Sequence, residues 1–370
     1  MGPSKGRIVL FGATGFTGRL TAADLVASGE RPLLVGRDQG KLDALATSLD
    51  GAAETAVANV EAPHTLRELL SDGDVLISTV GPFARWGDAA ARAAIDAGVH
   101  YLDSTGEPVF IRRIFEHYGA QAAAAGCGLL TAFGFDYVPG ALAASLALRD
   151  AGDGARGVDI GYFLVGDVGR EAASGGTLAS MAGIVADPGF AWRGGALVTT
   201  RTSASAQKFR VDGSDRYGVS VPGSEHFTVP RVAPDVRDVG VYLGAFGKLS
   251  RPMAALAPIT AVLTRIPGTA KAMERLANRV RPPGEGPSAE VRARQRSWVA
   301  AVARDAQGAE LATVDLAGPD PYDLTAAFLA WGAITARDGA IHGTGALGPV
   351  EAFGLDPLAA AAEAAGLRRT

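Results

Sequence analysis

Short apolar runs alternate with helix-forming stretches along the first third of the chain. The apolar runs predict strands at 8–11, 32–36, 55–59, 74–80, 100–103 and 127–131. The stretches between them predict helices at 18–28, 41–49, 63–71, 86–97 and 109–125. Strands that alternate with helices are typical of a parallel sheet covered by helices, so we expect a doubly wound, Rossmann-like α/β domain.

The pattern changes after about Gly134, where irregular glycine-rich segments and longer alternating runs begin. Runs at 295–304 and 310–316 flank the turn 305–308 and predict an antiparallel hairpin. Residues 322–336 predict a helix. We therefore expect a nucleotide-binding domain at 1–134, followed by a second domain that contains a largely antiparallel sheet.

Composition narrows the function classes. The net charge of −4 comes from scattered residues, so neither nucleic acid nor an anionic membrane is an expected partner. The single cysteine, Cys127, excludes an internal disulfide and a cysteine-based zinc site, and we expect it to be buried. The five histidines lack ligand spacing, so no metal site is expected, and no nucleophile elbow suggests a hydrolase.

Two observations concern location. No export signal precedes the first strand, and the apolar stretch 253–263 is too short to cross a bilayer. We expect a cytoplasmic protein without an integral membrane segment. The stretch 253–263 is interpreted as a core helix broken at Pro258; the alternative is an exposed surface that meets a lipid-like or carrier-bound substrate.

A glycine turn, GATGFTG, directly follows the first strand. Gly12 would permit the sharp turn, Gly15 the approach of a pyrophosphate, and Gly18 close packing of helix on strand. The turn would hold a dinucleotide at the positive end of a helix. The cofactor contacts expected here are Gly12, Thr14, Gly15, Phe16, Thr17 and Gly18.

The end of the second strand favours NADP(H) over NAD. An acidic residue at that position accepts from a ribose 2′-hydroxyl, whereas a cation accommodates a 2′-phosphate. Arg37 stands there, and Asp38 is better placed to cap the helix near Lys41. We therefore expect NADP(H) as the cofactor, with Arg37 on the phosphate.

Two other strand ends supply candidate cofactor contacts. The loop after the fourth strand should pass the ribose and nicotinamide, and its candidates are Val80, Gly81, Pro82 and Phe83. Asn59, after the third strand, is a candidate for the adenine amino group; a surface turn is the equal alternative.

Together these motifs resemble the saccharopine dehydrogenase-like oxidoreductases, including the bacterial trans-acting enoyl reductases. The matching segments are 12–18, 35–37, 79–83, 100–107, 134–139, 174–177 with 180–181, and 318–322. The resemblance implies an N-terminal NADP(H)-binding domain, a substrate-binding second domain at 135–340, and a C-terminal segment at 341–370 that returns to the first domain. Phe133, Tyr137 and Ser104 depart from residues common in the family, beside the expected substrate pocket.

Hydride transfer needs orientation and a proton from the protein. Tyr137 is the candidate proton donor, and a buried tyrosine with a backbone partner is the alternative. Asp103 is the second catalytic candidate, as a residue that orients the donor; the alternative is that it caps the helix near Val109. Glu107 is expected to interact with the positive N-terminal end of that helix. The candidate substrate contacts are Tyr101, Asp136, Ser174 and Thr177.

We thus expect an NADPH-dependent reductase of a conjugated C=C bond in an acyl or polyketide-like substrate, free or carrier-bound, with a homodimer as an option. One alternative is reduction of an imine or carbonyl, as in saccharopine-type C–N chemistry. The other is an NADP(H) sensor without catalysis.

Overall fold

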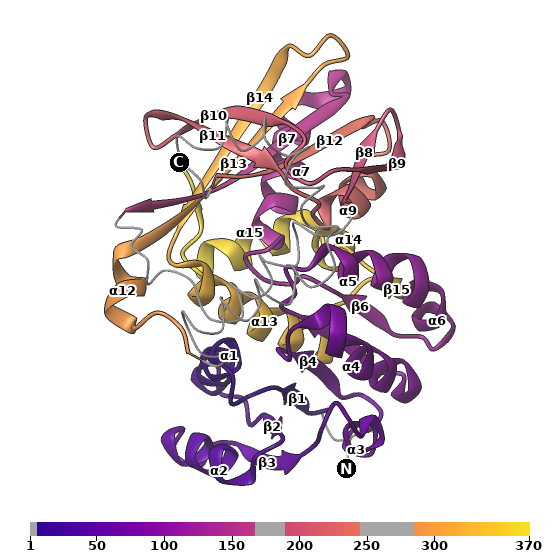
Figure 1. Ribbon diagram of the computed structural model, residues 1–370, viewed down its shortest axis with the longest axis vertical. Coiled ribbons are helices and arrows are strands. Elements are labelled where there is room, and N and C mark those ends of the chain that lie inside the picture. The colour runs from indigo at the N-terminus through magenta and orange to yellow at the C-terminus, as the bar shows by residue number, and fades with distance from the viewer. Residues whose placement is uncertain (1–5, 167–188, 245–284) are drawn as a thin grey trace, which may run out of the picture. The chain divides into compact units, whose positions relative to one another are not determined.

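The chain folds into two compact units, each with its own sheet (Figure 1). The computed structural model describes residues 6–166, 189–244 and 285–370. The first unit comprises 1–135, 283–285 and 322–347; the second comprises 136–282, 286–321 and 348–370.

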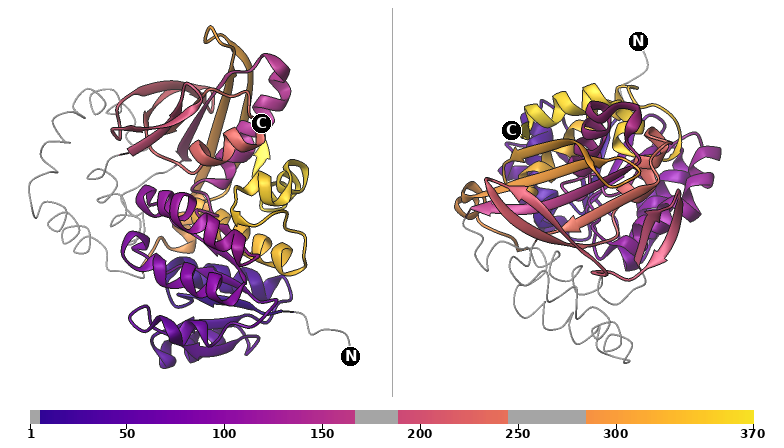
Figure 2. Two further views of the ribbon diagram at one scale, coloured as in Figure 1. Left: turned by 90° about the vertical axis from the view of Figure 1, so that its right-hand side faces the viewer. Right: turned by 90° about the horizontal axis from the view of Figure 1, so that it is seen from above.

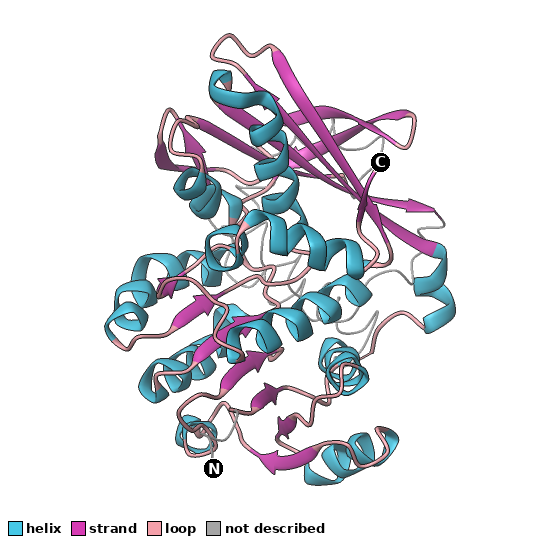
Figure 3. Ribbon diagram, turned by 180° about the vertical axis from the view of Figure 1, so that it is seen from behind, coloured by secondary structure: helices cyan, strands magenta, loops and turns pink. Residues whose placement is uncertain are grey.

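A seven-stranded parallel sheet forms the first unit. In spatial order its strands are β15 (Gly345–Ala346), β6 (Gly128–Leu130), β5 (His100–Asp103), β4 (Val75–Ser78), β1 (Ile8–Phe11), β2 (Leu33–Gly36) and β3 (Glu54–Val57). All four residues of β1 are at most 2% exposed, because helices flank both faces of the sheet (Figure 3). This arrangement confirms the doubly wound α/β fold. The order of the strands reverses between β1 and β4, the place where such sheets bind nucleotides.

The helices of this unit follow the predicted order. They are α1 (Phe16–Ala27), α2 (Gln39–Ser48), α3 (Pro63–Arg67), α4 (Phe83–Ala97), α5 (Pro108–Arg113), a π-helical turn η1 (Ile114–Tyr118), α6 (Gly119–Ala124) and α13 (Pro321–Arg337). The helix predicted at 109–125 is therefore interrupted by a π-helical turn. Cys127 is buried and free, as expected.

The second unit contains a nine-stranded sheet that is largely antiparallel, as predicted. Its main path runs through β10 (Ala206–Val211), β11 (Ser214–Ser220), β12 (Asp238–Leu243), β7 (Gly157–Gly166), β13 (Gln295–Arg304), β14 (Glu310–Gly318) and β16 (Arg368–Arg369), and β8 (Gly189–Arg193) and β9 (Ala196–Thr200) branch from β12. Only β12 and β7 pair in parallel on this path. The long strands β7, β13 and β14 are visible from two further directions in Figure 2.

The predicted hairpin is formed by β13 and β14. Its turn is held by the Asp305 carboxylate, which accepts from the N–H groups of Gln307 and Ala309 at 2.9 and 2.8 Å. The helices of this unit are α7 (Val138–Ala151), the 3₁₀ turn η2 (Gly152–Gly154), α9 (Glu225–Val232), α12 (Ala289–Arg294), α14 (Pro349–Phe353) and α15 (Leu355–Ala364). No helix among the described residues has the length and apolar character needed to cross a membrane.

The two units divide the chain differently from the expected 135–340 and 341–370 segments. Residues 322–347 belong to the first unit, because β15 extends its sheet beside β6 and Arg337 of α13 pairs with Glu30. Residues 348–370 belong to the second unit, where β16 pairs with β14. Only part of the C-terminal segment therefore returns to the first unit.

Candidate functional site

The glycine turn leaves the carboxyl end of β1 and leads directly into α1. Gly12 has φ of +89°, in the left-handed region that favours glycine, and its N–H donates to the carbonyl of Val35 in β2 at 2.8 Å. The helix begins at Phe16 with neither a side-chain cap among the described residues nor an acidic residue in its first turn. Its first N–H groups and its positive end are therefore suited to an anion.

Close packing explains why glycine stands at two positions of the turn. A Cβ atom on Gly18 would lie 2.3 Å from the carbonyl oxygen of Gly12 and 2.9 Å from Cα of Ala13. A Cβ atom on Gly12 would lie 2.8 Å from the side chains of Thr79 and Val80. Only glycine allows this approach of α1, β1 and the loop after β4, so the turn fits the pyrophosphate of a dinucleotide.

The other turn residues are accessible. Thr14, Phe16 and Thr17 are all half-buried. The ring of Phe16 contacts that of Tyr322 in α13 edge-on, with centroids 5.1 Å apart. Contact of these residues with a cofactor stays a prediction.

Arg37 lies exposed after β2, where the 2′-phosphate was predicted. It makes no hydrogen bond or ion pair with the described residues, so its guanidinium is available to a ligand. Asp38 caps α2 by accepting from the N–H of Lys41 at 3.1 Å, as anticipated. An acid that could select the 2′-hydroxyl of NAD is thereby engaged elsewhere.

The loop after β4 lies beside the glycine turn. The hydroxyl of Thr79 donates to the carbonyl of Gly12 at 3.1 Å. Val80 and Pro82 are half-buried and Gly81 is exposed, so all three are accessible. Phe83 differs: it is 5% exposed and packs against Phe110, so its side chain belongs to the core.

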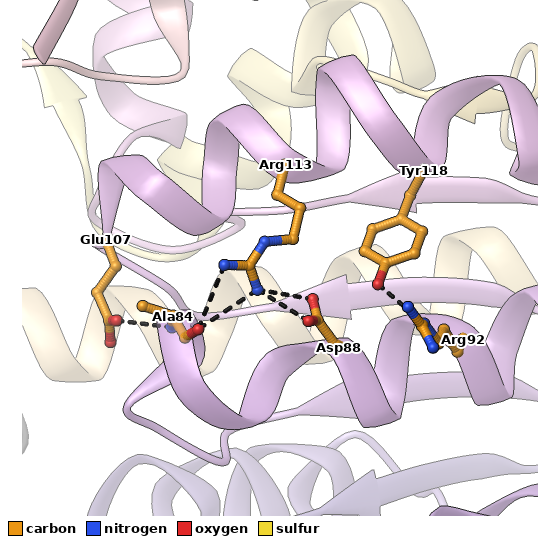
Figure 4. A network of polar contacts seen from close by, with 6 residues as sticks. All are labelled: Ala84, Asp88, Arg92, Glu107, Arg113 and Tyr118. Carbon is orange, nitrogen blue, oxygen red and sulfur yellow. Dashed lines mark hydrogen bonds and ion pairs between the residues drawn. The ribbon is translucent and has the colours of Figure 1, made fainter. Parts of the chain in front are cut away.

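Glu107 caps a helix other than the one expected. Its carboxylate accepts from the N–H groups of Phe83 and Ala84 at 2.9 and 2.8 Å, at the start of α4 rather than of α5. The contact with Ala84 is drawn in Figure 4. Arg113 of α5 binds Asp88 of α4 at 2.8 Å in the same region (Figure 4). These contacts hold α4, and the loop before it, against the segment after β5.

Asn59 holds a turn. Its side chain accepts from the N–H of Glu61 at 3.1 Å, and its own N–H donates to the hydroxyl of Thr65 at 3.2 Å. The alternative of a turn asparagine therefore describes its present contacts, and binding of adenine stays a prediction.

Asp103 ties two strand ends together. It is fully buried, and its Oδ1 atom accepts from the N–H groups of Thr105 and Ala132 at 2.9 Å each. Burial raises the pKa of Asp103 to about 6, against the lowering effect of these two N–H groups. Tyr101 on the same strand is fully buried as well, so it has no surface to offer a substrate in this conformation.

Tyr137 immediately precedes α7 in the second unit. It is 7% exposed, and its hydroxyl donates to the carbonyl of Pro222 at 3.2 Å. A buried tyrosine with a backbone partner was the stated alternative to a proton donor, and it describes the contact seen here. The neighbouring Asp136 is exposed. Ser174 and Thr177 lie outside the described residues.

One polar cluster was missed from the sequence. Glu225, the first residue of α9, is fully buried, and a hydrogen bond joins its Oε1 atom to the hydroxyl oxygen of Tyr162 of β7, 2.6 Å away. Burial raises the pKa of Glu225 to about 8. Ser224, Glu225 and His226 are consecutive polar residues, a pattern that usually marks a surface, so no sequence signal indicated this buried site.

Residues 8–127 match the family model for the saccharopine dehydrogenase NADP binding domain. A trans-acting enoyl reductase of Mycobacterium ulcerans is 36% identical over 179 residues, which are 47% of this chain and 43% of that protein. One from Mycobacterium bovis is 39% identical over 137 residues, 36% of this chain and 33% of that protein. The matched region is thus less than half the length of these curated relatives.

The fold is similar over its whole length to apo saccharopine dehydrogenase (L-Glu forming) from Saccharomyces cerevisiae. The structural alignment covers 99% of this chain and 99% of that one, with a TM-score of 0.60 and 12% sequence identity. The resemblance stated from the sequence is confirmed, and the match at 8–127 confirms NADP(H) as the cofactor of the first unit.

Proposed function

We propose that this chain is an NADPH-dependent reductase of a conjugated C=C bond in an acyl substrate. Its residues 8–127 match the saccharopine dehydrogenase NADP binding domain, which supports the cofactor. The observation that carries the proposal is the glycine turn at the start of α1, with Arg37 at the end of β2; within the described part of the chain α1 has no side-chain cap and Arg37 no hydrogen-bond or ion-pair partner. The relatives named trans-acting enoyl reductases support the C=C bond as the target.

The first unit would hold the cofactor through three strand ends. N–H groups of the turn and of the first residues of α1 would bind the pyrophosphate, and Arg37 would bind the 2′-phosphate. The accessible loop residues Val80, Gly81 and Pro82 would lie along the remainder of the cofactor. Asp103 would keep the ends of β5 and β6 in place at the same edge of the sheet.

NADPH, when bound, supplies a hydride to one carbon of the C=C bond. The other carbon must then receive a proton, and we propose the Tyr137 hydroxyl as its source. The Tyr137 hydroxyl donates its proton in a hydrogen bond to the carbonyl of Pro222. Because this acceptor is neutral, the hydroxyl keeps its proton, and it can rotate to donate to a stronger acceptor such as the carbanion.

We propose Asp136, Ser174 and Thr177 as substrate contacts, and an acyl or polyketide-like substrate that is free or bound to a carrier. A cytoplasmic location agrees with the single cysteine, Cys127.

The test is oxidation of NADPH by the purified chain with a panel of enoyl thioesters, monitored by the absorbance of the reduced cofactor. We expect turnover with NADPH and much less with NADH. Deuterium from C4-labelled NADPH should appear on carbon of the former double bond. A chain that binds NADPH but oxidises it with no member of the panel would contradict the proposal.

Reduction of a C=N bond is the second candidate, because the fold matches a saccharopine dehydrogenase over 99% of the chain. The same labelled cofactor distinguishes the two reactions. An aldehyde and an amino acid supplied together would then yield a product with deuterium on the carbon next to nitrogen. A sensor without catalysis would bind NADPH and leave every substrate unlabelled.

A further inference from the structure

Glu225 is a carboxyl group enclosed by the second unit. It is fully buried; its Oε1 atom lies 2.6 Å from the hydroxyl oxygen of Tyr162, and its Oε2 atom makes no hydrogen bond with the described residues. An ionised carboxylate needs several donors when it is buried, whereas a protonated one needs fewer. The surroundings therefore favour the protonated form.

Counting protons at Tyr162 leads to the same conclusion. Its hydroxyl oxygen lies 2.6 Å from Oε1 of Glu225 and 3.3 Å from the carbonyl oxygen of Tyr137. A hydroxyl has one hydrogen and can make a linear hydrogen bond to one of these acceptors at a time. Both contacts are linear hydrogen bonds at once when Glu225 carries a proton and donates it to Tyr162, which then donates to Tyr137.

The same loop holds the other end of Tyr137. The Tyr137 hydroxyl donates to the carbonyl of Pro222, three residues before Glu225, and the rings of Tyr137 and Tyr162 meet edge-on with centroids 5.9 Å apart. A Cβ atom on Gly223 would lie 2.4 Å from Oε2 of Glu225 and 3.1 Å from the Tyr137 ring. The Tyr137 backbone and ring are thus both fixed by contacts that converge on residues 222–225.

None of the described groups that affect the pKa of Glu225 is a cation. Burial has the largest effect on the pKa of Glu225 and raises it. The Tyr162 hydroxyl and the backbone N–H of Glu225 lower this pKa, and the Asp136 carboxyl raises it. The charged residues on the elements packed against α9 do not face Glu225. Arg149 and Asp150 on α7, Arg193 on β8 and Asp238 on β12 are exposed, and Glu351 on α14 pairs with Arg231.

We propose that Glu225 and Tyr162 are positioning residues for Tyr137: a protonated Glu225 directs the Tyr162 hydroxyl onto the Tyr137 carbonyl and so sets the place of the Tyr137 ring. Loss of the proton would turn the Tyr162 hydroxyl toward the carboxylate and release that carbonyl. The inference rests on the proposed function only in taking Tyr137 as the proton donor of the reaction.

The positioning itself can be tested without turnover. Tyrosine labelled with ¹³C at Cζ gives seven signals in this chain, and those of Tyr137 and Tyr162 are assigned by their Phe variants. We expect both signals to move together between pH 7 and 9 in the unmodified protein. In Glu225→Gln they should stay constant, because the amide still donates to Tyr162 but does not ionise. The matched control is Glu363→Gln, at an exposed site, which should behave as the unmodified protein.

The pH profile of kcat/KM with NADPH and an active enoyl thioester then connects positioning to turnover. We expect activity to fall at least tenfold as Glu225 ionises, and Glu225→Gln to retain it. Tyr162→Phe, which removes the relay, should lower kcat at every pH with little change in KM for NADPH.

Each outcome decides the proposal. Tyrosine signals that titrate alike in the unmodified protein and in Glu225→Gln would refute the positioning pair. Signals that differ while the two activity profiles coincide would refute its link to turnover. A chain that reduces no substrate refutes the proposed function instead, and the NMR titration still decides whether Glu225 positions Tyr137.

Discussion

Gly18→Ala is the sharpest test of the cofactor site. Gly18 lies in the first turn of α1, where alanine would normally stabilise a helix by about 0.5–1 kcal/mol. Here its Cβ atom would lie 2.3 Å from the Gly12 carbonyl oxygen and 2.9 Å from Cα of Ala13. Both contacts are with backbone, so the turn itself must move.

The expected effect follows from these distances. Real Cβ atoms essentially never come within 3.0 Å of such neighbours, and overpacking of this kind typically costs about 1–3 kcal/mol of unfolding free energy. Displacement of the Gly12 carbonyl would also misalign the N–H groups at the start of α1. We therefore expect NADPH affinity to fall at least tenfold, about 1.4 kcal/mol.

The assay combines urea unfolding with titration of NADPH, and the control is Gly40→Ala in α2. A Cβ atom on Gly40 meets its nearest neighbour, the Asp38 carboxylate, at an ordinary 3.6 Å, so this variant should be neutral or stabilised by up to about 1 kcal/mol. It should bind NADPH as the unmodified chain does. If Gly18→Ala is as stable as Gly40→Ala and binds NADPH equally well, the close approach is not what requires glycine here.

Three further predictions concern single side chains. Arg37→Ser should weaken NADPH binding about tenfold or more and leave NADH binding unchanged, because only NADPH carries the 2′-phosphate. The control Arg31→Ser, at another exposed position, should change the binding of neither cofactor. Equal losses of affinity for both cofactors in Arg37→Ser would contradict binding of the 2′-phosphate by Arg37. Glu107→Ala should lower the unfolding free energy by about 1–3 kcal/mol in urea titrations, because two N–H groups of α4 lose their acceptor. For Glu225 the folded pKa of about 8 exceeds the ordinary 4.5, so the unfolding free energy of the unmodified chain should fall as pH rises between these values. Glu225→Gln should therefore gain stability relative to the unmodified chain through that window, and parallel curves would refute the shift.

The first unit was predictable because its signals are local. Strands such as β1 are continuous apolar runs, since helices cover both faces of the sheet, and the glycine turn directly follows the first of them. The cap formed by Asp38 was also predictable, because its acceptor and donor lie three residues apart. The nine-stranded sheet was foreseen only in the hairpin of β13 and β14, where both strands are close in sequence.

Features that depend on distant packing were not predictable. Glu107 directly precedes α5, so the sequence suggested that helix, yet its carboxylate binds the start of α4. Glu225 is buried with a hydrogen bond to Tyr162, 63 residues away in the sequence. The helix α13 has an apolar face, but nothing in its sequence tells which of two sheets that face will join.

The position of β15 has a consequence for the order in which the protein folds. The first unit leaves its sheet after β6, at Leu130, and receives its last strand only at Gly345. Every residue of the second unit up to Pro321 is therefore synthesised before the first sheet can be completed. The six strands β1 to β6 can pair once Leu130 has been synthesised, whereas β15, two residues at the edge of the sheet, can be added only after the chain of the second unit up to Pro321 has been made.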